Sequence, residues 1–138
     1  MWAFRLDDFG EDRAIEARAL TYLLTNAALD KKALNATILN VEGMASYADY
    51  FLICSGSSAR QVQAIADWIE KVARENGVHP LSVEGQSSGK WVLMDFGSVV
   101  VHAFFEPVRE FYDLEGLWAD APRLPLPDAR AQLAASAS

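Results

Sequence analysis

Hydrophobic positions change their spacing several times along the chain, and two long stretches have the spacing of amphipathic helices. The first covers residues 12–32, and the second begins at Ser58 and ends at Gly77. Ser58 and Gln61 form a capping-box pattern, and Gly77 is suited to a left-handed helix end. The apolar stripe of the second helix consists of Val62, Ile65, Ala66, Ile69, Val72 and Ala73. Both stretches are therefore predicted to be helices that cover a core.

Short runs of β-branched and aromatic residues between and after these helices predict strands. The predicted strands are 37–41, 50–54, 81–84, 90–95 and 98–105. The run 50–54 is apolar on both faces, which favours a central position in a sheet. A final helix is expected over 107–118, with Pro107 in its first turn. This order predicts a single α/β domain whose mixed sheet of about five strands is flanked by helices.

The two ends of the chain differ in composition from the part between them. Residues 1–10 are expected to form a flexible N-terminus, and residues 11–121 the folded domain. Residues 122–138 are rich in Pro, Ala and Ser, which predicts a disordered tail.

The hairpin of residues 90–105 carries the most information about function. If Phe96 and Gly97 form its loop, Trp91 faces His102, Leu93 faces Val100, and Asp95 faces Ser98. Alternation then gives one wholly apolar face, predicted to pack on helices: Val92, Met94, Phe96, Val99, Val101, Ala103 and Phe105. The other face holds Trp91, Leu93, Asp95, Ser98, Val100, His102 and Phe104.

Two interpretations of this second face remain open. It is either a partly covered sheet face, on which His102 rests on Trp91, or a docking face for another protein. Protein interfaces are enriched in aromatic anchors, and Trp is a frequent hot spot. For the docking interpretation, the predicted contact residues are Trp91 as anchor, Leu93 and Val100 as an apolar floor, Asp95 as the group that pairs with a basic residue, and His102.

Composition narrows the choice of partner and compartment. Twelve basic and nineteen acidic residues give a net charge of −7, which argues against autonomous binding of nucleic acid. The single cysteine, Cys54, cannot form an internal disulfide, and residues 1–8 do not resemble a signal or transit peptide. No apolar run approaches the ~20 residues of a membrane span. We therefore expect a soluble cytoplasmic protein without membrane or direct nucleic-acid specificity.

Several strings imitate catalytic motifs, but each lacks its required context. Residues 85–90 are one residue short of a Walker loop and precede a strand instead of a helix. Ser87 and Lys90 fit S-x-x-K without its partner motifs, and residues 95–97 spell the kinase DFG motif without a catalytic loop. An acid/base pair of Glu84 and Asp95 remains an alternative, although structural or interfacial roles are favoured. The chain is predicted not to be an enzyme.

The loop of residues 56–58 is the remaining candidate for ligand chemistry. It precedes a helix, so it either caps that helix, which is favoured, or binds an anion such as a phosphate. The rival function is thus a nucleotidyltransferase, but the strands lack the paired carboxylates that hold Mg²⁺. His79 and His102 lie in different elements without a cluster of other ligands. No metal and no cofactor are expected.

Several long segments are similar to the RsfS/Iojap family of ribosomal silencing factors. They are residues 48–58, 65–67, 83–85, 89–97, 100–102 and 112–121. The resemblance extends from about Leu20 to Pro122 without a large insertion. Two departures remove negative charge: Ser98 stands where the family usually has Asp, and Asn40 where an acid is common.

This resemblance implies both a fold and a function. The fold is expected to be like a nucleotidyltransferase core without catalytic residues. The function implied is that of a translational repressor, which binds the large ribosomal subunit through ribosomal protein uL14 and blocks association with the small subunit under starvation or in stationary phase. A homodimer is expected in isolation. The net charge of −7 suits a basic target.

Overall fold

The structure, a computed structural model, describes residues 16–127. The predicted flexible N-terminus, the first residues of the predicted first helix and the end of the predicted tail lie outside this range. The elements are, in order, α2 (Ala17–Asp30), β1 (Leu34–Asn40), β2 (Tyr50–Gly56), α3 (Ala59–Glu75), β3 (Ser82–Glu84), β4 (Trp91–Asp95), β5 (Val99–Phe105), α4 (Glu106–Tyr112), α5 (Leu114–Leu117) and β6 (Arg123–Leu124).

The strands form one mixed sheet of six strands in the order β3-β4-β5-β2-β1-β6. Its centre is β2, which is buried along its whole length and runs parallel to β5; the other neighbouring pairs are antiparallel. The single α/β domain and the central position of 50–54 are confirmed. The sixth strand, β6, was not predicted, because residues 123 and 124 lie in the segment assigned to the tail.

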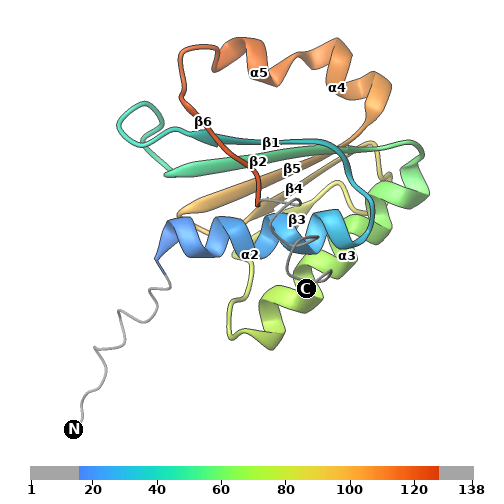
Figure 1. Cartoon of the computed structure of the whole chain (residues 1–138). Coiled ribbons are helices and arrows are strands. Elements are labelled where there is room, and N and C mark those ends of the chain that lie inside the picture. The colour runs from blue at the N-terminus through green and yellow to red at the C-terminus, as the bar shows by residue number, and fades with distance from the viewer. Residues whose placement is uncertain (1–15, 128–138) are drawn as a thin grey trace, which may run out of the picture.

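Helices cover the two faces of the sheet unequally (Figure 1). α2 and α3 lie on one face and enclose the larger core with the inward residues of β2, β4 and β5. Six of the seven residues of the apolar hairpin face are buried in this core, and the seventh, Phe105, packs against it partly buried, so that prediction is confirmed. On the other face, the short helices α4 and α5 enclose a smaller core.

The predicted register of the hairpin is wrong by two residues. Trp91 pairs with Phe104, Leu93 with His102 and Asp95 with Val100. The N–H of Phe96 donates to the carbonyl of Val99 at 2.9 Å, so the two loop residues are Gly97 and Ser98. Gly97, with φ +92°, takes the first turn position, which requires positive φ, while the side chain of Phe96 remains in the core. Because the shift is an even number of residues, the two faces keep their predicted members.

The predicted final helix is divided in two at Asp113. This residue adopts the left-handed conformation, with φ +48°, and ends α4. Its carboxylate then accepts a hydrogen bond from the N–H of Gly116 at 3.2 Å and so caps α5. The break lets the chain turn across the sheet, so that Trp118 reaches Phe51 on β2.

Candidate functional site

The second face of the sheet is covered over β1, β2 and β5 but open over β4 and β3. Beneath α4 and α5 lie Leu39, Phe51, Ile53, Val100 and Phe104, against Val108, Leu114 and Trp118 of the helical segment. Trp91 and Leu93 of β4 only flank this cluster and stay partly exposed. The edge of the helical layer therefore crosses the predicted docking face.

The five predicted contact residues are placed at different depths. Trp91, Leu93 and Asp95 are half-buried and accessible from outside. Val100 and His102 are buried, with exposed fractions of 4% and 6%. A partner could not touch these two residues unless the helical layer moved. The face is thus covered over β5 and accessible over β4. The docking interpretation stays a prediction for Trp91, Leu93 and Asp95.

Trp91 and His102 are joined by a hydrogen bond inside this face. The indole Nε1–H donates to Nδ1 of His102 at 3.2 Å, so the histidine proton resides on Nε2. Burial lowers the pKa of His102 to about 4. The imidazole is therefore neutral at physiological pH, which suits it to hold the indole and not to serve as a general acid or base near pH 7.

Aromatic rings continue from Trp91 onto α4. The ring of Tyr112 lies 5.1 Å from that of Trp91, and Phe111 packs edge-on against Tyr112, also at 5.1 Å. Phe111 and Tyr112 are 80% and 53% exposed. These two residues were not among the predicted contact residues. The adjacent apolar pair at the end of a short helix was the available signal, because such a helix can bury little of its surface.

A small hollow lies beside Trp91 at the open edge of the sheet. It measures about 300 Å³ and is lined by Glu84, Gly85, Trp91 and Leu93. Glu84 pairs with Leu93 across β3 and β4, so its side chain shares their face. The hollow thus has apolar walls and one carboxylate.

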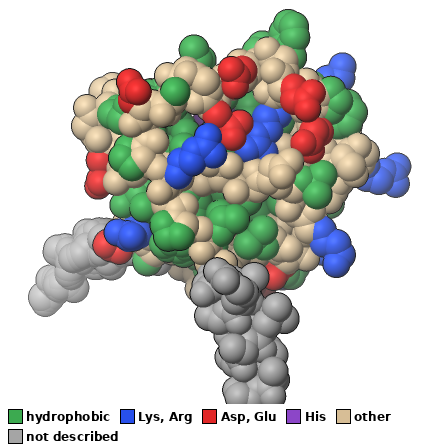
Figure 2. All heavy atoms as spheres, turned by 45° about the horizontal axis from the view of Figure 1, so that its top comes forward, with side chains coloured by type: hydrophobic (Ala, Val, Ile, Leu, Met, Phe, Trp, Pro, Cys, Tyr) green, Lys and Arg blue, Asp and Glu red, His purple; other side chains and the backbone are tan. Residues whose placement is uncertain are grey.

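Acidic groups surround this face. Residues 106–126 contain five acidic and two basic side chains, and Figure 2 shows red acidic groups spread over the helical layer, with exposed hydrophobic ones at its margin. One of the two basic groups, Arg109, is buried and donates to both carboxylate oxygens of Glu115, at 3.0 and 2.8 Å. These hydrogen bonds are the main reason why the pKa of Glu115 is lowered. This excess of acidic over basic side chains suits a basic partner.

The loop of residues 56–58 is occupied by the chain itself. The side-chain oxygen of Gln61 accepts hydrogen bonds from the N–H and the hydroxyl of Ser57, at 2.7 and 2.9 Å, while Ser58 caps the backbone N–H of Gln61. The side-chain amide nitrogen of Gln61 donates to the carbonyl of Lys32 at 3.2 Å. The N–H and hydroxyl of Ser57 and the N–H of Gln61 are thus already bonded within the chain, in agreement with the favoured interpretation as a cap.

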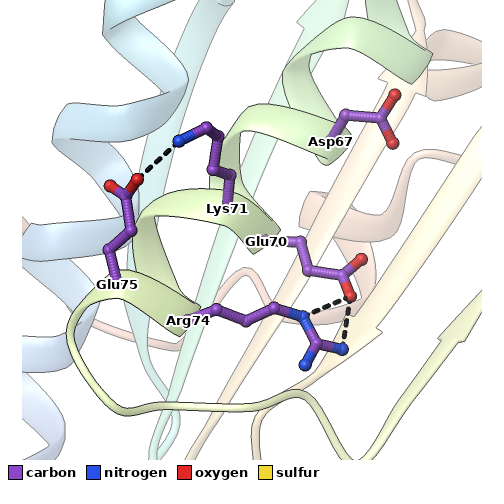
Figure 3. A pocket seen from close by; sticks show the side chains of 5 residues that line it. All are labelled: Asp67, Glu70, Lys71, Arg74 and Glu75. Atoms are coloured by element: carbon purple, nitrogen blue, oxygen red, sulfur yellow. Dashed lines mark hydrogen bonds and ion pairs between the residues drawn. The ribbon is translucent and has the colours of Figure 1, made fainter.

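A larger hollow than the one beside Trp91 lies on the opposite layer, along α3 (Figure 3). It is open, measures about 590 Å³ and is lined by Asp67, Glu70, Lys71, Arg74 and Glu75. Arg74 pairs with Glu70 at 2.7 Å, and Lys71 pairs with Glu75. Such exposed i,i+4 pairs are typical of a solvated helix face.

Residues 16–127 contain no group of three or more His, Cys, Asp or Glu side chains placed to hold a metal ion. Within the same range, no helix has the length and apolar character needed to cross a membrane.

The partly exposed aromatic surface formed by Trp91, Leu93, Phe111 and Tyr112, here called the aromatic face, is therefore the strongest candidate for function.

Comparison with known proteins places this geometry in a family. A family model described as "Ribosomal silencing factor during starvation" matches residues 14–138. The ribosomal silencing factors RsfS of Halalkalibacterium halodurans and Bacillus subtilis are 49% and 46% identical; the aligned parts cover 78% and 76% of this chain and 92% and 89% of theirs. A crystal structure of a Chromobacterium violaceum protein matches with a TM-score of 0.75 and 35% identity, over 76% of this chain and 88% of that one.

Proposed function

This chain belongs to the family of ribosomal silencing factors (RsfS), and we propose that it represses translation by steric hindrance. It binds the large ribosomal subunit through ribosomal protein uL14 and blocks association with the small subunit under starvation or in stationary phase. It acts in the cytoplasm, where the ribosomes are, and forms a homodimer when it is not bound to them. No step of this mechanism requires a cofactor or a catalytic residue.

The observation that carries the proposal is the aromatic face. An exposed apolar patch bordered by polar groups is a mark of a protein interaction site. Trp91 is held in place by His102 and by the ring of Phe104 at 4.8 Å, so little side-chain entropy is lost when a partner covers it. Rigid, half-buried aromatic anchors of this kind commonly supply most of the affinity of an interface. His102 supports the anchor from below, and Val100 lies buried in the same cluster.

The acidic charge supports the choice of a basic ribosomal protein as partner. Complementary fields accelerate encounter and disfavour wrong partners, whereas the net charge of −7 repels the phosphates of ribosomal RNA. The chain would therefore recognise a protein component of the subunit and not its RNA.

Sedimentation with purified ribosomal subunits tests this function. The wild-type chain should migrate with the large subunit and prevent formation of 70S particles. Trp91→Ala should weaken large-subunit binding by at least about 30-fold, which corresponds to about 2 kcal/mol for a hot spot. The matched control is Trp68→Ala, which removes an indole from α3 on the opposite layer, and it should bind normally.

The half-exposed Trp91 also contributes to packing, so a second variant keeps the test decisive. Tyr112→Ala removes a ring that is 53% exposed and should leave the fold intact by circular dichroism while it weakens binding. If both folded variants bound the large subunit as the wild type does, the aromatic face would not be the docking site. If the wild-type chain failed to bind large subunits, the proposed function would be wrong.

A further inference from the structure

We propose that the hollow between β3 and β4 receives an arginine side chain of the partner protein and that Glu84 is its pairing carboxylate. This inference rests on the proposed function and specifies the chemistry of the same face. Glu84 was not among the predicted contact residues. It lies at the edge of the sheet, where its carboxylate stands beside the apolar surfaces of Trp91 and Leu93.

The hollow is preformed because a glycine fixes its wall. Gly85 follows Glu84 with φ +86°, and a Cβ at this position would lie 2.0 Å from the carbonyl oxygen of Trp91. Only glycine lets the chain leave β3 so close to β4. The next residue, Gln86, donates to the carbonyl of Gln63 at 3.2 Å and to the carboxylate of Asp67 at 2.7 Å. The loop that follows Glu84 is thus tied to α3 and holds the carboxylate near the indole.

The indole of Trp91 lines the hollow but offers it no hydrogen-bond donor. Its only donor, Nε1–H, already points inward to His102. A partner at the hollow therefore meets apolar walls and a carboxylate, a combination that suits the apolar stem and charged end of a basic side chain. Arginine fits better than lysine, because a planar guanidinium can stack on an indole while it donates two parallel hydrogen bonds to one carboxylate.

The charges around the hollow favour the same occupant. Within residues 16–127 no basic side chain lies within ion-pair distance of Glu84. Asp95 lies on the same face as Glu84, two residues beyond Leu93, and adds negative charge. An incoming arginine would therefore encounter two carboxylates on this part of the face.

Binding of purified uL14 to the full chain tests the role of Glu84. Glu84→Gln should raise the Kd about tenfold and act mainly on the dissociation rate, as expected for a charge pair that is desolvated in the complex. The matched control is Glu75→Gln on α3, which removes the same charge from the opposite layer. It should change the Kd by less than twofold. An unchanged Kd for Glu84→Gln would overturn the inference.

A double-mutant cycle then identifies the occupant. Each surface arginine of uL14 is replaced by Ala and by Lys, and each variant is measured against wild-type chain and Glu84→Gln. For one arginine of uL14, replacement by Ala should cause little further loss of affinity when the chain already carries Glu84→Gln. Replacement of the same arginine by Lys should not restore wild-type binding. Coupling to a lysine alone would overturn the assignment to arginine. If wild-type chain binds and Trp91→Ala weakens binding, but no uL14 residue is coupled to Glu84, this inference fails while the proposed function stands.

Discussion

The two faces of the sheet are built from the same strands but closed by helices of very different length. α2 and α3 have 14 and 17 residues, whereas α4 and α5 have 7 and 4. At 1.5 Å per residue, α4 and α5 are about 10 and 6 Å long. Six strands spaced by about 4.8 Å span about 24 Å, so the short helices leave part of their face open. The open part is over β3 and β4, where the aromatic face and the hollow lie.

The two cores also differ in the polar groups that they bury. Beneath α2 and α3, the buried hydroxyls of Thr21 and Thr25 only bond to the preceding turn of their own helix. On the other face, buried His102 holds Trp91, and buried Arg109 links α4 to Ser55 of β2, with Nη1 2.7 Å from the hydroxyl oxygen. The buried polar groups on the first face thus bond locally, whereas those on the second face join separate elements. The second face is also the one that we propose for docking.

The largest effect on stability is expected for Leu52→Ala in the first core. The side chain is fully buried at the centre of β2, and its truncation leaves a cavity. The free energy of unfolding should fall by about 4 kcal/mol, within the range of about 2–5 for such substitutions. Urea denaturation monitored by circular dichroism measures this. A loss below about 1 kcal/mol would mean that the first core is not tightly packed.

The second expected effect depends on pH and belongs to the other face. The pKa of His102 is about 4 in the folded chain and near 6.5 when it is unfolded. As the pH falls below 6.5, only the unfolded state gains a proton on this histidine, so the folded state loses stability between pH 6.5 and about pH 4. Above pH 6.5 and below about pH 4, His102 contributes no further change in stability. The loss should approach about 3 kcal/mol at pH 4.

His102→Asn provides the control for this pH dependence. Asparagine can still accept a hydrogen bond from Trp91 but does not titrate in this range. Unfolding curves between pH 7 and 4 should therefore be flatter for the variant than for the wild type. Parallel curves would show that His102 is protonated in the folded chain and that the second face is more open than described.

The third effect concerns the ion pair that holds the helical layer. Arg109→Met leaves Glu115 and the buried hydroxyl of Ser55 without their common partner. Removing one member of a buried pair costs about 3–5 kcal/mol, and the figure here should be about 2 because Glu115 keeps contact with water. Arg74→Met, at an exposed pair on α3, is the matched control and should cost less than about 0.5 kcal/mol. Equal losses in the two variants would contradict this account.

Patterns along the chain were sufficient to predict the parts of the fold that depend on local chemistry. The period of the apolar residues predicted α3, and the Ser58 cap is present with the Gln61 N–H at 3.1 Å. The alternation in 90–105 predicted which hairpin residues enter the first core. The exact register was missed, because it depended on whether Phe96 or Gly97 begins the turn, and burial of the Phe96 side chain decides this.

The features that the sequence did not reveal depend on distant contacts. Two residues form β6 because the carbonyl of Pro122 accepts from the N–H of Asn40 and brings the chain beside β1. The burial of Val100 and His102 depends on how far the helical layer extends, which is determined by the left-handed turn at Asp113. The role proposed for Glu84 depends on its cross-strand neighbour Leu93, a pairing that no local pattern shows.

The smallest effect on stability, and the sharpest test of the comparison, is expected for Leu93→Ala. It makes the same truncation as Leu52→Ala but on the open part of the second face, where the side chain is only half-buried. The free energy of unfolding should fall by about 1 kcal/mol, because the site is already in contact with solvent. Binding of the large subunit should nevertheless weaken about tenfold, since Leu93 forms a wall of the hollow. For Leu52→Ala the order is reversed: stability falls steeply, while the folded fraction binds as the wild type does. If Leu93→Ala cost as much stability as Leu52→Ala and left binding unchanged, the two faces would not be functionally distinct.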